Sequence, residues 1–261
     1  MKVSVLGHYF SNGGEYQAQS AVAVVMPTVL RSTILRAVQS VFDQDFEGRV
    51  QLLIGIDKMF GPVEPLIALL RRAPENVSCL VLGLPFSTSS RHGGPHNPGD
   101  GGSLRAILTL MANARYVTYL DDDNRWRKNH LSKVVETVDG KVWGYSYRML
   151  FDQETDTEIA IDQWDSVGPG KGRFADAGGF VDPNCLIIDK VKAVHTLGHW
   201  ASTPDGRLGM SADRNFYAAI SGYPHGSTNS VTVDYYVRRD NLIAAFMGQD
   251  LEFTEKLVLS D

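Results

Sequence analysis

Short apolar runs alternate with helix-like segments through the first half of the chain, and this alternation constrains the fold more than any other feature. The apolar runs cover residues 21–26, 50–56, 77–84 and 116–120, and helical periodicity fills residues 32–43, 62–72 and 103–114. Strands that alternate with helices of this length pair in parallel through right-handed crossovers. Runs that are apolar at every position also suit strands covered on both faces. The sequence therefore predicts an α/β fold with a mostly parallel central sheet flanked by helices.

The second half of the chain has a less regular order of predicted elements. Helices are expected at 131–138 and 211–220, a hairpin from 142–151 and 157–163, and strands at 181–188 and 231–237. The sequence contains no internal repeat, and no convincing linker separates the two halves. We therefore expect residues 1–261 to form a single domain with a mixed second half.

Composition and charge exclude several classes of protein. The net charge of −5 provides no basic excess for binding nucleic acid, and no apolar run is long enough for a transmembrane helix. The N-terminus lacks the features of an export signal. Cys79 and Cys185 lie inside apolar runs, where a small core residue is expected rather than a disulfide or zinc site. A cytoplasmic location is the expectation, and the sequence does not indicate the oligomeric state.

Three consecutive aspartates, Asp121 to Asp123, directly follow the apolar run at residues 116–120. Adjacent carboxylates repel one another, and a bound divalent cation would offset that repulsion, because Mg²⁺ and Mn²⁺ prefer hard oxygen ligands. Strand alternation predicts Asp121 and Asp123 on the same side and Asp122 pointing away, so we expect the loss of Asp122 to matter least. A solvated acidic turn or a helix N-terminus is the alternative interpretation.

Two other predicted strands also end in polar groups. Pro27 and Thr28 follow the first run and Asp57 follows the second. In parallel α/β sheets, ligands bind beyond the carboxyl ends of the strands. Arg105 lies at the start of the third predicted helix, where a guanidinium suits charge-assisted bonds to phosphate. The irregular segment 86–102 precedes it and is expected to form a functional loop over that site.

These segments resemble the family 2 glycosyltransferases with the GT-A (Rossmann-like) fold. The resemblance rests on order and spacing over residues 21–125, in the segments 22–28, 35–46, 53–57, 101–105 and 114–123. It continues more weakly through 182–188, 197–200 and 211–217. It implies a metal-dependent enzyme that transfers a sugar from a nucleotide-diphosphate sugar, with UDP as the first expectation, to the hydroxyl of a carbohydrate or other acceptor. It also implies inversion of the anomeric centre.

The resemblance assigns roles to particular residues. Residues 1–124 become the nucleotide-binding half and residues 125–261 the acceptor-binding half. The expected nucleotide-sugar site consists of Pro27, Thr28, Asp57, Arg105, Asp121 and Asp122. Asp123, together with Asp121, is the expected ligand of Mn²⁺ or Mg²⁺, which stabilises the leaving diphosphate.

Three later residues have a role implied by the resemblance and a simpler alternative. Asp213 is the expected general base, although Ala212 stands where the family has a glutamate, and an aspartate at a helix N-terminus is also favoured by the dipole. Trp200 is either a stacking wall for the acceptor sugar or a core residue. His225 is either a third metal ligand or a structural histidine in a turn.

Two alternative functions remain open at this stage. A sugar-nucleotide nucleotidyltransferase also uses a nucleotide and Mg²⁺, but a Gly-rich basic segment usually follows its first strand, and here Pro27-Thr28-Val29-Leu30 follows. A non-catalytic carbohydrate-binding relative would keep the sheet without needing the acidic cluster. Release of nucleoside diphosphate rather than pyrophosphate would distinguish a glycosyltransferase from a nucleotidyltransferase. Cation-dependent binding of a nucleotide-sugar would distinguish it from the non-catalytic relative.

Overall fold

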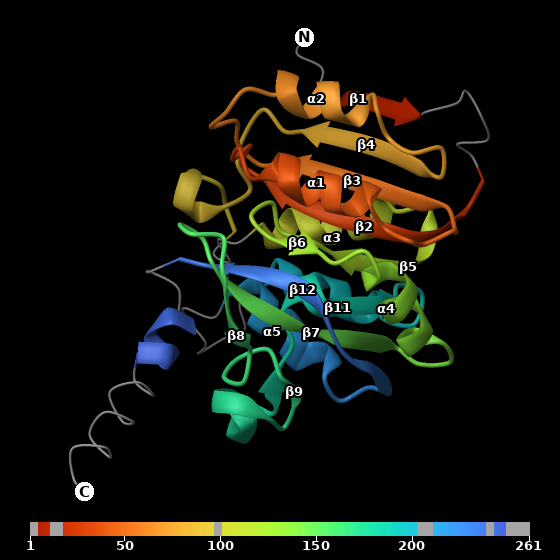
Figure 1. Ribbon diagram of the computed structural model, residues 1–261. Coiled ribbons are helices and arrows are strands. Elements are labelled where there is room, and N and C mark those ends of the chain that lie inside the picture. Colours follow the sequence, from red (N-terminus) through yellow and green to blue (C-terminus); the bar gives the residue numbers. More distant parts are fainter. Residues whose placement is uncertain (1–4, 11–17, 97–100, 203–210, 239–242, 249–261) are drawn as a thin grey trace, which may run out of the picture.

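The computed structural model describes residues 5–10, 18–96, 101–202, 211–238 and 243–248 (Figure 1). Its main element is one large mixed sheet. The strands of this sheet are β1 (Val5–Phe10), β2 (Ser20–Thr28), β3 (Val50–Ile56), β4 (Val77–Gly83), β5 (Ala114–Tyr119), β6 (Arg125–Trp126), β7 (Trp143–Asp152), β8 (Glu158–Ile161), β11 (Leu186–Asp189) and β12 (His225–Val237). They lie in the order β1-β4-β3-β2-β5-β11-β7-β12-β6, and β8 pairs with the outer part of β7.

The first half of the sheet is the parallel core that the apolar runs predict. β4, β3, β2 and β5 are neighbours and pair in parallel. Nearly every side chain of β2 and β3 is buried, because helices cover both faces. Each of the predicted runs is a strand, with bounds that differ from the expectation by a few residues at most.

The helices are α1 (Ile34–Phe42), α2 (Glu64–Leu70), α3 (Gly102–Met111), α4 (His130–Val138) and α5 (Ala212–Ile220). The chain moves outward from β2 to β3 and β4 through α1 and α2, and then returns through α3 to β5 on the other side of β2. Right-handed crossovers in opposite directions place their helices on opposite faces, and Figure 1 shows α1 in front of the sheet and α3 behind it. The point of reversal lies between β2 and β5.

The second half extends the sheet with mixed pairing. β11 lies antiparallel between β5 and β7, β12 is parallel to β7, and β8 forms the predicted hairpin with β7. The expected strand at 181–188 is shorter than predicted, because Pro183 has no N–H to donate and begins a 3₁₀ turn (Pro183–Cys185) before β11. Three further 3₁₀ segments cover Ser90–His92, Gly172–Ala177 and Val194–Trp200, and β9 (Gly168–Pro169) pairs with β10 (Gly179–Phe180).

β1 was not predicted from the sequence. It pairs with the outer edge of β4 in an antiparallel register. The outermost strand of the first half therefore runs opposite to its neighbour. Among the described residues, none of the helices has the length and apolar character needed to cross a bilayer.

A close backbone contact joins α3 to the later part of the chain. A Cβ atom on Gly102, at the start of α3, would overlap the carbonyl oxygen of Trp200 and press on the Cβ of Ala212, the first residue of α5. Only glycine leaves room for this approach. The first turns of α3 and α5 are therefore held against each other through residue 102.

A buried arginine, Arg148 on β7, organises the second half. Its side chain is 1% exposed and donates to Asp162 (2.7 Å), Asp182 (2.7 Å) and Asp165 (3.0 Å). Burial opposes the charge on Arg148, but the carboxylates outweigh it and raise its pKa well above the usual value. The guanidinium also lies 4.0 Å from the ring centre of Tyr235 on β12. One side chain thus ties β7, β12 and two loops together.

Replacement of Arg148 by methionine should destabilise the fold severely. Asp162 and Asp182 would remain buried without a cation, whereas Asp165 keeps Arg214 (2.5 Å), and breaking a buried ion pair from one side costs about 3–5 kcal/mol. Urea unfolding followed by circular dichroism measures the loss. The matched control is Arg115→Met, which removes a half-exposed arginine from buried Asp189 but leaves that carboxylate Lys192 Nζ at 3.9 Å and the backbone N–H donors of Val191 and Lys192. Equal midpoints for the two variants would contradict the importance of the Arg148 cluster.

Candidate functional site

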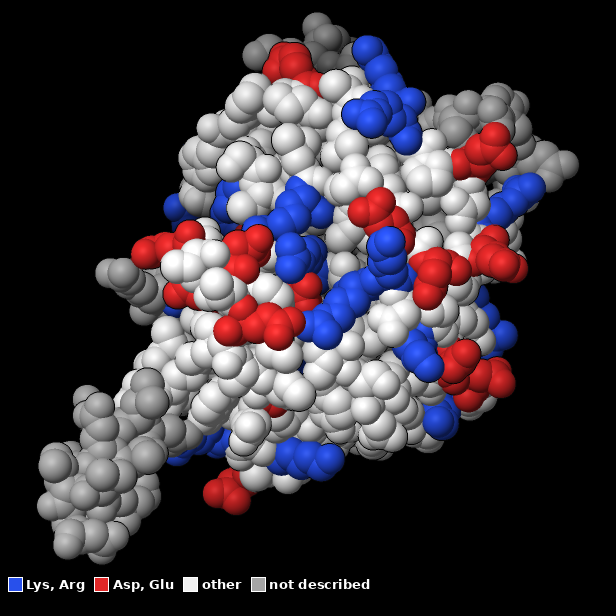
Figure 2. Space-filling model, viewed as in Figure 1, with Lys and Arg blue, Asp and Glu red and all other residues white. Residues whose placement is uncertain are grey.

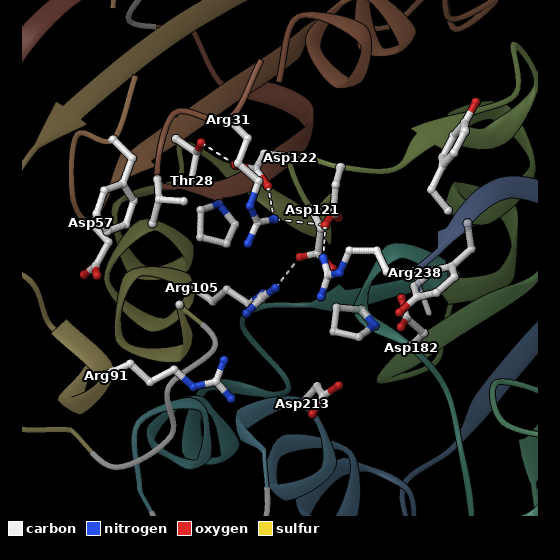
Figure 3. A pocket seen from close by; sticks show the side chains of 18 of the residues that line it. Thr28, Arg31, Asp57, Arg91, Arg105, Asp121, Asp122, Asp182, Asp213 and Arg238 are labelled. Carbon is white, nitrogen blue, oxygen red and sulfur yellow. Dashed lines mark hydrogen bonds and ion pairs between the residues drawn. The ribbon is translucent and has the colours of Figure 1, made fainter. Parts of the chain in front are cut away.

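A pocket of about 500 Å³ opens at the carboxyl ends of β2, β3 and β5, at the point where the strand order reverses (Figure 3). This is the position at which open α/β sheets bind their ligands. The pocket is lined by Pro27, Thr28, Val29, Arg31, Asp57, Phe60, Arg91, His92, Gly101, Arg105, Asp121, Asp122, Asp123, Asp182, Pro183, Asp213, Tyr235, Tyr236 and Arg238. Eight residues that the sequence singled out therefore lie together: Pro27, Thr28, Asp57, Arg105, Asp121, Asp122, Asp123 and Asp213.

The expectation that Asp122 points away from the site is wrong. β5 ends at Tyr119, so the aspartates belong to the turn that follows, and strand alternation no longer applies to them. Asp122 is buried and accepts hydrogen bonds from the Thr28 hydroxyl (2.6 Å) and from Arg31 (2.9 Å). Burial raises the pKa of Asp122, and Arg31 and Thr28 partly oppose that rise. Asp122 fixes the turn to the end of β2.

Asp121 is held by Arg105 and by an asparagine from the second half of the chain. Arg105, on α3, forms an ion pair with Oδ1 of Asp121. The backbone N–H of Asp121 donates to Oδ1 of Asn184 (2.7 Å), and Nδ2 of Asn184 donates to Oδ2 of Asp121 (2.9 Å). Asn184 is fully buried and also bonds Asp182, which belongs to the Arg148 cluster. The position of Asp121 thus depends on both halves of the chain.

Asp123 is the most electrostatically perturbed of the three aspartates. Its Oδ2 accepts from Nη1 of Arg31 (2.9 Å) and from Nη1 of Arg238 (2.9 Å). Burial raises the pKa of Asp123 to about 6, and the charges of Asp121 and Asp122 add to this effect, whereas Arg31 and Arg238 oppose it. Burial within a group of three carboxylates thus disfavours the charged form of Asp123.

Asp57 orders the loop that follows β4. Its carboxylate accepts from the Ser87 hydroxyl (2.5 Å) and from the N–H and hydroxyl of Thr88 (both 2.7 Å). Burial opposes ionisation, but these hydrogen bonds outweigh it and hold the pKa of Asp57 below its ordinary value. The loop then brings Arg91 and His92 to the pocket. Residues 97–100 of the expected 86–102 loop lie outside the described residues.

Trp200 is a core residue, which corrects its expected role as an acceptor wall. Its side chain is fully buried, stacks on Phe216 with ring centres 4.2 Å apart, and lies 5.0 Å from the ring of Tyr119. A side chain with no exposed surface cannot stack on a sugar. The Arg105 guanidinium lies 5.3 Å from the Trp200 ring centre, so Trp200 acts on the site through Arg105.

His225 lies too far from the aspartates to be the expected third metal ligand. Its role is therefore the structural one. It stands at the start of β12 and stacks on Trp143, with ring centres 4.6 Å apart. Tyr235 and Tyr236, near the other end of β12, are the residues that reach the pocket. His225 pairs with Trp143 and Tyr235 with Leu150, seven residues apart on β7, so roughly 23 Å of strand separates them.

Asp213 lies in the first turn of α5 and lines the pocket on the side away from Asp121 and Asp122 (Figure 3). Its Oδ1 accepts from the Ser211 hydroxyl and from the N–H of Arg214 (2.7 Å). Among the described residues, no hydrogen bond reaches Oδ2, so that oxygen is available for another proton donor.

Sequence reasoning missed Arg31, Arg91, Arg238 and Asn184. Arg31 was detectable in principle, because it lies in the same strand-end loop as Thr28. The places of Arg238 and Asn184 depend on where β12 and β11 join the sheet, for which the sequence carries no local signal.

The aspartates fit a divalent cation in their chemistry and in their charge. Asp121 and Asp123 offer hard carboxylate oxygens, and burial beside two further carboxylates raises the pKa of Asp123. The described part of the chain contains no group of three or more histidine, cysteine, aspartate or glutamate side chains arranged to hold a metal. A cation here would therefore take one or two protein carboxylates and complete its coordination with phosphate oxygens and water, as Mg²⁺ commonly does.

Basic and acidic side chains are interspersed over the face of the molecule in Figure 2. This distribution agrees with the net charge of −5 and shows no broad basic surface on that face. The concentration of opposite charges inside the pocket is therefore a local feature.

No protein-family model and no curated protein sequence matches the chain. Solved structures do share its fold. TarS 1–349 of S. aureus, in complex with UDP-GlcNAc, matches with a TM-score of 0.59 and 14% identity, over 86% of this chain and 60% of that one. The mannosyltransferase PcManGT from Pyrobaculum calidifontis, in complex with GDP-Man and Mn²⁺, matches with a TM-score of 0.56 and 12% identity, over 86% and 59%. The chain thus spans about 60% of these proteins, and 37% of the longer TarS chain. The expected α/β, GT-A-like fold is confirmed.

The stability difference between the wild type and Asp123→Asn should depend on pH. With a pKa of about 6 against an ordinary 3.8, Asp123 binds more proton when folded than when unfolded between those values, so the free energy of unfolding of the wild type falls as pH rises. The asparagine of the variant does not ionise, so its free energy of unfolding shows no such fall. In EDTA the variant should be more stable by up to about 3 kcal/mol at about pH 7.5, and by about half as much at about pH 5. Urea unfolding at both pH values measures this, and an unchanged difference would contradict it.

Proposed function

We propose that the chain is a metal-dependent glycosyltransferase that transfers a sugar from a nucleotide-diphosphate sugar to an acceptor hydroxyl. The charge of the pocket is the observation that carries the proposal. Six aspartates and four arginines line it, so its formal net charge is −2. A diphosphate would be repelled by such a pocket unless a divalent cation bound with it. The pocket's place at the switch point of a GT-A-like sheet supports the same function.

The donor's nucleotide belongs in the first half of the pocket under this proposal. Pro27 and Thr28 end β2, and Asp57 ends β3 and orders the loop that carries Arg91. We assign residues 1–124 to donor binding and residues 125–261 to acceptor binding within a single domain. UDP is the first choice of nucleotide, since TarS was solved with UDP and UDP-GlcNAc, and GDP is the second, since PcManGT was solved with GDP-Man.

Asp121 and Asp123 would hold Mn²⁺ or Mg²⁺ beside the diphosphate. When bound, the cation supplies charge stabilisation to the leaving nucleoside diphosphate as the sugar–phosphate bond breaks. Asn184 and Arg105 orient Asp121, and Thr28 and Arg31 orient Asp122. Because Asn184, Arg105 and Thr28 are themselves buried, Asp121 and Asp122 are held in place before the donor arrives.

Asp213 is the general base of the proposed reaction. It faces the pocket from the second half, away from Asp121 and Asp122, and its Oδ2 would accept the proton of the acceptor hydroxyl as that oxygen attacks the anomeric carbon. Attack from the side opposite the departing diphosphate inverts the anomeric centre. The bond to the diphosphate breaks as the new glycosidic bond forms, and the proton ends on Asp213.

A nucleoside diphosphate and Mn²⁺ together should stabilise the wild type against heat, and neither alone should do so to the same extent. Asp123→Ala should weaken cation-dependent nucleotide binding by more than the roughly tenfold typical of losing an outer-sphere metal partner. Differential scanning fluorimetry with UDP, GDP and their sugar conjugates measures the effect, and Asp139→Ala, outside the pocket, is the control. Absence of any stabilisation by these ligands with Mn²⁺ would refute the proposed function.

Asp213→Asn should lower the turnover number by about 10²–10⁴ while leaving nucleotide affinity unchanged, because a general base acts only in the chemical step. The readout is release of nucleoside diphosphate from the donor that binds, with Asp176→Asn as an exposed control. Release of pyrophosphate instead would favour a nucleotidyltransferase. Cation-dependent binding without any turnover would favour a non-catalytic carbohydrate-binding protein.

A further inference from the structure

Two arginines converge on Oδ2 of Asp123, one of the two carboxylate oxygens that a cation at this residue could take. Nη1 of Arg31 bridges Oδ1 of Asp122 and Oδ2 of Asp123, each at 2.9 Å, and Nη1 of Arg238 reaches the same Oδ2 at 2.9 Å (Figure 3). Arg31 comes from the loop after β2, and Arg238 directly follows β12. The two guanidinium groups thus approach Asp123 from elements at opposite ends of the sequence.

The backbone of Asp123 is fixed independently of these two side chains. Nη2 of Arg36, on α1, donates to the Asp123 carbonyl oxygen (2.7 Å), and the Arg36 guanidinium lies 3.4 Å from the ring centre of Tyr236. In contrast, the side chains of Arg31 and Arg238 are 49% and 42% exposed. Ion pairs of half-exposed arginines are weak, so these two side chains can change partner while Asp123 stays in place.

A divalent cation on the Asp123 carboxylate, at Oδ2 or across both oxygens, would compete with the two guanidinium groups for that carboxylate, because like charges a few ångströms apart repel. The displaced arginines are still anchored at the wall of the pocket. A diphosphate bound beside the cation would offer them its phosphate oxygens. The planar guanidinium group forms strong, often bidentate hydrogen bonds with phosphate.

We propose that Arg31 and Arg238 hold Asp123 only until a divalent cation binds, and that they then transfer to the diphosphate of the donor. This inference rests on the proposed function and assigns two further donor-binding residues to it. Before the cation arrives, the arginine pair stands in for it by neutralising Asp123. Afterwards the same pair neutralises the charge that the donor brings. Cation and nucleotide therefore bind with positive coupling. The cation releases the two arginines for the diphosphate, and the diphosphate draws the two arginines away from the carboxylate that the cation needs.

The test compares Arg31→Gln, Arg238→Gln and the double variant with the wild type. Binding of MnCl₂ alone is measured from the electron paramagnetic resonance signal of free Mn²⁺, and nucleotide affinity is measured by calorimetry with and without Mn²⁺. UDP is the nucleotide, or GDP if UDP does not bind the wild type. The control is Arg127→Gln, an arginine paired with Asp234 outside the pocket. Urea unfolding verifies that each variant is folded.

Without nucleotide, each single variant should bind Mn²⁺ more tightly than the wild type, by up to about fivefold, because a competitor for Asp123 is gone. With Mn²⁺ present, the same variants should bind the nucleotide at least about tenfold more weakly, because a charged hydrogen bond to phosphate is lost. These opposite changes support the exchange. Unchanged or weaker Mn²⁺ binding in the variants overturns it, and so does tighter Mn²⁺ binding with unchanged nucleotide affinity. A wild type that binds neither Mn²⁺ nor nucleotide refutes the proposed function itself, and the exchange with it.

Discussion

Ionised carboxylates at the end of a buried strand need cations nearby, and the structure around the pocket is arranged to supply them. Arg105 from α3, Arg31 from the loop after β2 and Arg238 after β12 all pair with the aspartates that follow β5. These elements are far apart in the sequence, so the charge balance exists only once the sheet has assembled. The balance is also incomplete, because six aspartates and four arginines line the pocket. Folding thus leaves one position in the pocket with residual negative charge.

A chain of buried polar contacts connects that position to the rest of the second half. Asn184 bonds Asp121 on one side and Asp182 on the other, and Asp182 pairs with Arg148. Burial raises the pKa of Asp182 to about 6 despite the neighbouring Arg148, so this network is held at considerable electrostatic cost. Such a cost is tolerated where precise placement of a functional group depends on it. The loops of the second half are therefore coupled to the geometry of Asp121.

Local sequence signals predicted the parallel core well, because apolar runs and helical periodicity report directly on burial. The strand-end groups Thr28, Asp57 and Asp123 followed from that prediction, since parallel strands share one edge. Long-range pairing was beyond reach: β1 joins β4, and β12 brings Arg238 to the pocket, without any local signal. Asp122 was misplaced because the strand ends two residues before the aspartates begin. Trp200 and His225 were misassigned because an aromatic or imidazole ring has the same sequence pattern in a core as in a site.

The contact at Gly102 has a consequence for how the pocket can open. Arg105 stands one turn further along α3, and Asp213 stands in the first turn of α5, so this glycine sets the separation between the residue that holds Asp121 and the proposed base. Backbone packed directly on backbone cannot yield as side chains do. The two sides of the pocket are therefore held at a fixed spacing where α3 meets α5. Any opening of the pocket along the line between α3 and α5 would first have to break the contact at Gly102.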